Sequence, residues 1–182
     1  MRIGIFCDLA VSTTEIFLVL ALYRLLRDVN AWLATVMVVL GLMDVPIYFM
    51  NTANDFGAIL FARGSDFVAA FEQAQRDAMT MLFLSFHQYG TLINDVFFGL
   101  WLVPLGMLVY RSRFLPRALG VWLVLNGFAY LAENIAGLFF RQYAPLVANI
   151  IIPLQLGEVV FALWLLVIGA KPKARIGQTP AT

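Results

Sequence analysis

Five long apolar segments, separated by short stretches that hold most of the charged residues, dominate this sequence. A helix needs about 20 residues to cross a hydrocarbon core of about 30 Å. Hydrophobic residues make up 62% of the chain and charged residues 13%, against about 45–50% and about 25% in soluble domains. The pattern predicts an all-α polytopic transmembrane bundle in one domain, residues 1–170, with five spans: residues 3–26, 31–50, 78–110, 115–140 and 146–169.

The third apolar segment is too long for one bilayer crossing and too short for two. As a single helix, the residues from 78 to 110 would extend about 50 Å at about 1.5 Å per residue. We therefore predict one continuous helix that projects beyond the hydrocarbon boundary toward Asp77.

The segment from residue 51 to residue 77 mixes charged and apolar residues. Phe67, Phe71 and Ala74 recur at helical spacing opposite Glu72 and Arg76, which predicts a short external amphipathic helix between spans two and three. The C-terminal stretch, residues 171–182, is polar and contains proline, so we expect a disordered cytoplasmic tail.

The distribution of Lys and Arg predicts the orientation, because short loops rich in these residues stay in the cytoplasm. One side of the predicted bundle collects Arg24, Arg27, Arg111, Arg113, Arg117, Lys171, Lys173 and Arg175, and the other collects Arg2, Arg63, Arg76 and Arg141. This places the C-terminus inside and the N-terminus outside, in a multi-pass protein of the bacterial inner membrane. An outside N-terminus without the features of a signal peptide leads us to expect that a preceding helix is missing from the chain.

Several functional classes lack the sequence features that they require. A net charge of +1 argues against a nucleic-acid partner, which needs clustered basic residues. Cys7 is the single cysteine, so the chain can form neither an internal disulfide nor a CxxC pair. No GxSxG, GxGxxG, P-loop or HExxH string occurs. The sequence therefore predicts no catalytic residue and no metal site, and it identifies no cofactor.

Three strings resemble a known family: ALYRLLRDVNAWLA, HQYGTLINDVFFGLWLVPLGMLVYRSRFLPRALG and GEVVFALWLLVIGA. They are similar to sequences of the DUF4386 family of bacterial integral membrane proteins, whose function is unassigned. The resemblance covers nearly the whole chain. Family members typically carry one more helix before the ALYRLL segment, so the resemblance implies that this chain lacks the first helix of the family.

Each predicted span carries polar residues at intervals of three, four or seven, which places them on one helix face. A charged group at the bilayer centre costs about 2.5–3.5 kcal/mol on insertion scales, so such faces normally point into the protein. We therefore predict that the polar faces meet in an outward-facing cavity that holds a ligand. The candidate ligand-binding residues are Glu15, Asp44, His87, Asn94, Asp95, Asn126, Glu133, Gln155 and Glu158.

The leading hypothesis is a membrane protein that binds a small molecule or a cation in this acid-rich cavity, as a sensor, an accessory subunit or a transport component. A second hypothesis is a membrane-embedded enzyme that uses His87 with Asp95 or Glu133. A third is a structural bundle that associates with other membrane proteins, in which Glu158 bonds Asn126 or a backbone carbonyl only to fix packing. The predicted partners are the lipid bilayer and either a second copy of the chain or another membrane protein.

Overall fold

The computed structural model describes residues 2–64, 66–140 and 142–170 and contains only helical elements among them. These are α1 (Arg2–Leu26), α2 (Ala31–Arg63), the 3-10 helix η1 (Asp66–Val68), α3 (Gln73–Arg111), α4 (Arg117–Phe139) and α5 (Ala144–Val167). Each of the five α-helices contains a segment long and apolar enough to cross a membrane. The predicted all-α fold with five spans is confirmed, whereas the predicted tail, residues 171–182, lies outside the described residues.

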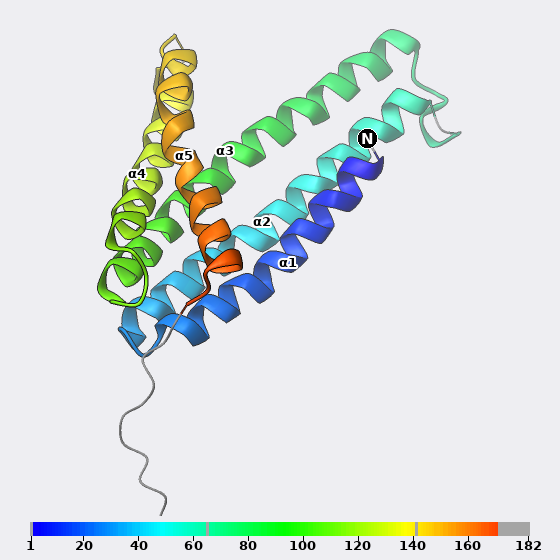
Figure 1. The fold of residues 1–182 in the computed structure, drawn as a ribbon. Coiled ribbons are helices and arrows are strands. Elements are labelled where there is room, and N and C mark those ends of the chain that lie inside the picture. Colours follow the sequence, from blue (N-terminus) through cyan, green and yellow to red (C-terminus); the bar gives the residue numbers. More distant parts are fainter. Residues whose placement is uncertain (1, 65, 141, 171–182) are drawn as a thin grey trace, which may run out of the picture.

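The five helices form two groups that share α3. In Figure 1, α1, α2 and α3 run side by side, while α4 and α5 form a pair that diverges from α1 and α2 toward the end where the chain begins. Helix α3 packs against both α2 and α4. We call the end with the start of α1 the N-terminal end. The opposite end, with the α1–α2 and α3–α4 connections, holds Arg24, Arg27, Arg111, Arg113 and Arg117 and is called the arginine-rich end.

The region between spans two and three differs from the prediction. Helix α2 continues past residue 50 to Arg63 and ends at Gly64, whose φ of 62° lies in the left-handed region that glycine tolerates. Helix α3 begins at Gln73, where the Glu72 side chain accepts from a backbone N–H and the Gln75 side chain accepts from the Glu72 N–H. The prediction of a separate amphipathic helix is wrong. Helices α2 and α3 both extend into this region, and the described residues between them form only the short 3-10 helix η1.

Helix α3 is continuous over 39 residues, which confirms the prediction of a single long third helix. Glycines let its backbone approach α4 closely. A Cβ atom added at Gly106 would lie 2.6 Å from the carbonyl oxygen of Gly120, and one at Gly99 would lie 2.9 Å from that of Gly127. Small residues at such positions are what permits close packing of membrane helices.

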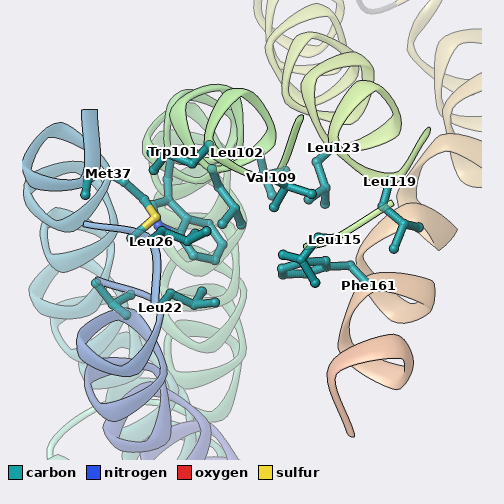
Figure 2. Packing of buried hydrophobic residues seen from close by; sticks show 14 residues of the cluster. Leu22, Leu26, Met37, Trp101, Leu102, Val109, Leu115, Leu119, Leu123 and Phe161 are labelled. Atoms are coloured by element: carbon teal, nitrogen blue, oxygen red, sulfur yellow. The ribbon is translucent and has the colours of Figure 1, made fainter. Parts of the chain in front are cut away.

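An apolar core connects all five helices in the half of the bundle toward the arginine-rich end. Figure 2 shows Leu22 and Leu26 of α1 close to Met37 of α2 and Trp101 of α3, with Phe161 of α5 in the same cluster. Leu102, Leu105, Leu108 and Leu123 of this cluster are completely or almost completely buried. The polar side chains described next lie farther toward the N-terminal end.

Candidate functional site

The site is built around a pocket of about 470 Å³ between α1 and α5, with α3 and α4 as its walls. Most of its lining is apolar and includes Leu18, Trp101 and Phe161. The carboxylates in the lining are Glu15 from α1 and Glu158 from α5. Two acidic side chains from opposite helices therefore face one largely apolar space.

Two residues on α4, one helical turn apart, hold the Glu158 carboxylate. The Asn126 amide donates a hydrogen bond to Glu158 Oε1, and the Tyr130 side chain lies within hydrogen-bonding reach of the same residue. Asn126 is fully buried. The Asn126–Glu158 bond is the contact that the structural-bundle hypothesis anticipated, and the same carboxylate also lines the pocket.

Behind Glu15 lies a buried polar group formed by three helices. The carboxyls of Glu15 and Asp44 are within hydrogen-bonding reach of each other, and Asn94 of α3 lies within the same reach of Asp44. Asp44 is only 3% exposed, and its Oδ1 atom has no hydrogen-bond partner. This buried acceptor can receive a proton or a hydrogen-bond donor.

A third set of polar side chains joins these groups. Gln155 of α5 donates a hydrogen bond of 3.4 Å to Glu133 of α4. Asp95 of α3 lies within electrostatic range of both Glu133 and Asp44. Tyr130 lies within electrostatic range of Glu158, Asp95 and Glu133 and so links this set to the Asn126–Glu158 pair. Through hydrogen bonds and electrostatic range, eight of the nine predicted residues therefore form one connected polar group across the five helices, although only Glu15 and Glu158 among them line the pocket.

His87 belongs to a different group, nearer the N-terminal end. Its Nδ1 atom lies 3.1 Å from Asp55 Oδ1 on α2. Asp55 is in turn within electrostatic range of Asp8, which accepts a hydrogen bond of 3.4 Å from Tyr48. The pairing of His87 with Asp55 gives no support to an enzyme that combines His87 with Asp95 or Glu133.

The sequence-based list of site residues omitted Asp55 and Tyr130. Asp55 lies beyond residue 50, where the second predicted span ends, so the predicted polar face of that span does not include it. Tyr130 lies on the same helix face as Asn126 and Glu133, and this helical spacing is the signal that could have added it. Its hydroxyl reaches Glu158 only because α4 and α5 pack together.

Among the described residues, no lysine or arginine neutralises the acids of the pocket. Within residues 2–64, 66–140 and 142–170, no Lys or Arg forms a salt bridge with Glu15, Asp44, Asp95, Glu133 or Glu158; the Arg–carboxylate pair found there joins Arg27 to Asp28. The same described residues contain no group of three or more His, Cys, Asp or Glu side chains able to hold a metal ion. The acids of the pocket are therefore paired with each other and with neutral side chains within the described part of the chain.

Comparison with known proteins gives a family but no activity. The family model described as "Domain of unknown function (DUF4386)" matches residues 1–169. An uncharacterized protein of Archaeoglobus fulgidus is 36% identical over 79 residues, which cover 43% of this chain and 46% of that protein. The match thus spans about half the length of this relative. No solved structure matches the chain.

Proposed function

This chain belongs to the DUF4386 family, and from that membership and the geometry above we propose that it binds a lipophilic, positively charged small molecule between α1 and α5. The observation that carries the proposal is the position of Glu15 and Glu158 on opposite sides of one apolar pocket. The protein would serve as a sensor, an accessory subunit or a transport component of the inner membrane.

The size and lining of the pocket support a small organic ligand. Ligand pockets typically measure about 300–1,000 Å³ and combine apolar walls with few polar groups, and this one measures about 470 Å³. The apolar walls favour a hydrocarbon or aromatic body, while the two carboxylates favour an ammonium group. A cation between them offsets the cost of holding acids in an apolar medium.

The other residues of the connected polar group are assigned to supporting roles. Asn126 and Tyr130 orient the carboxylate of Glu158 by donating hydrogen bonds. Asp44 and Asn94 support Glu15 from behind. We propose that Asp95, Glu133 and Gln155 extend the negative potential of the pocket toward the N-terminal end, and that this end faces outward, as the eight-to-four distribution of Lys and Arg predicts.

The proposal can be tested by quenching of tryptophan fluorescence, because Trp101 lines the pocket and is 5% exposed. The protein is reconstituted in nanodiscs of zwitterionic lipid and titrated with bromodecylamine or, as the neutral probe, bromodecanol. The quenching that is seen in the unmodified protein but not in Trp101→Phe comes from Trp101, and it measures how much of the pocket is occupied by the probe. The amine should bind on the order of tenfold or more tightly than the alcohol, since hydrogen bonds to charged groups contribute about 1.5–3 kcal/mol.

Glu158→Gln should remove most of this preference, because the amide retains an acceptor for Asn126 but has no charge. Asp77→Asn is the matched control, since it removes one exposed acid from the start of α3, outside the pocket. Equal affinities of the amine and the alcohol in the unmodified protein would refute the proposal. An equal loss of preference in Asp77→Asn and Glu158→Gln would also refute it, because the effect would then come from overall charge.

A further inference from the structure

A second groove lies between α3 and α4 near the arginine-rich end, on a different surface from the pocket between α1 and α5. Its volume is about 330 Å³, and its apolar lining includes Met107 and Val124. Val121 and Leu125, also in the lining, are 47% and 51% exposed. The groove therefore opens along the outer surface of the helices, where hydrocarbon chains surround a membrane protein.

Cationic side chains lie at the arginine-rich end of this groove. Arg111 is part of the lining. The guanidinium carbon of Arg117 lies 5.7 Å from the centre of the Tyr110 ring, and Tyr110 also lines the groove. No ion pair within the described ranges, 2–64, 66–140 and 142–170, involves either arginine. Both positive charges are thus available to an anion at one end of an apolar groove.

The close packing of two glycines brings the end of α3 and the start of α4 together. Gly106 and Gly120 allow the two backbones to meet, just before α3 ends at Arg111 and just after α4 begins at Arg117. A side chain at either glycine would separate the two helices. The presence of both arginines at one end of the groove therefore follows from tertiary packing.

We propose that this groove binds one anionic phospholipid, with an acyl chain along Val121 and Leu125 and the phosphate between Arg111 and Arg117. The argument is charge complementarity: an apolar groove with two unpaired arginines at one end matches the shape and charge of such a lipid. Arginine offers several N–H donors in a plane that fits phosphate oxygens. This inference does not depend on the ligand pocket and goes beyond the proposed function.

The test is native mass spectrometry of the protein with phosphatidylglycerol and phosphatidylcholine of identical acyl chains. One phosphatidylglycerol should remain bound on the order of tenfold more tightly than phosphatidylcholine, because basic residues near the membrane surface attract anionic lipids. The double variant Arg111→Gln/Arg117→Gln should lose this preference. The control is Arg24→Gln/Arg27→Gln, which removes two positive charges from the same end but outside the groove.

A second variant tests the apolar part of the site. Val121→Trp fills the groove without changing the charge of the protein and should lower the retention of the lipid. Because the Val121 side chain is half exposed, this variant should leave the thermal midpoint of unfolding unchanged. Inorganic phosphate, which lacks an acyl chain, should not displace the lipid. Equal retention of the two lipids, or equal losses in the two arginine double variants, would overturn the proposal. A lipid-free dimer that Val121→Trp abolishes would instead assign the groove to a second copy of the chain.

Discussion

The side-chain amide of Asn126 in α4 donates a hydrogen bond to the carboxylate of Glu158 in α5. This bond joins the two helices of the diverging pair, and the carboxylate that accepts it also lines the pocket. Asn126 is fully buried, so water cannot replace the bond. A contact that fixes helix packing therefore also positions the group that we assign to ligand binding.

Replacement of Asn126 should destabilise the bundle. Asn126→Ala should lower the free energy of unfolding by about 1–3 kcal/mol, because it removes the hydrogen bond that the fully buried amide donates to the half-buried Glu158 carboxylate. In a double-mutant cycle with Glu158→Leu, which removes the acceptor, the coupling energy should be about 0.6–1.7 kcal/mol, the range from the mean to the maximum measured for interhelical hydrogen bonds in a membrane protein. Thr13→Ala, at an exposed residue that bonds only within its own helix, is the control. A coupling energy of zero would contradict this role.

The contact between α3 and α4 predicts a difference between two glycine variants. Gly106→Ala should lower stability by about 1–3 kcal/mol, the usual cost of overpacking, because its Cβ would lie 2.6 Å from the Gly120 carbonyl oxygen. Gly4→Ala should be nearly neutral, since no atom lies within 4 Å of its added Cβ. Thermal unfolding in detergent measures both variants, and equal midpoints would argue against the close approach.

His87 should be dispensable for ligand binding, although the sequence placed it among the candidates. It lies beside Asp55, and neither residue lines the pocket. His87→Gln should leave the amine-dependent quenching of Trp101 unchanged, whereas Glu15→Gln should weaken amine binding roughly tenfold by removing a charge from the wall of the pocket. Loss of binding in His87→Gln, with the fold intact, would show that the two polar groups act together.

The predicted orientation can be tested with topology reporters. A reporter fused after Arg175 should be active in the cytoplasm, and one inserted at Gly64 should be active outside, because the side richer in Lys and Arg stays inside. Gly64 is a suitable insertion point, since it ends α2 in a left-handed conformation. The reverse result would invert the orientation and leave the helical fold unchanged.

The polar face of each helix was predictable from the sequence, but which polar faces contact one another was not. The interval between Asn126, Tyr130 and Glu133 places these side chains on one side of α4 in any helical structure. Nothing in that interval shows that Glu158 meets Asn126 while Glu133 meets Gln155. Which polar groups meet depends on the relative rotation and height of two helices, and close packing over the whole interface determines both.

The same distinction explains why the predicted end of the second span, at residue 50, was too early. In the sequence of this segment, Asn51 and Asp55 have the polarity of residues at the end of a span, because their hydrogen-bonding and charged partners lie on another helix. In the folded chain, Asn51 donates to the carbonyl of His87 at 3.0 Å and Asp55 lies beside the imidazole of His87, so α2 continues as a helix through both residues.

The five helices, their apolar lengths and the polar residues on each were predictable, because hydrophobicity and helical periodicity act within one segment. The packing of the helices against one another places Glu15 and Glu158 in one pocket and His87 beside Asp55. Those contacts join residues far apart in the chain. They are selected because buried polar groups need partners and because glycine contacts such as Gly106–Gly120 set how closely the helices pack.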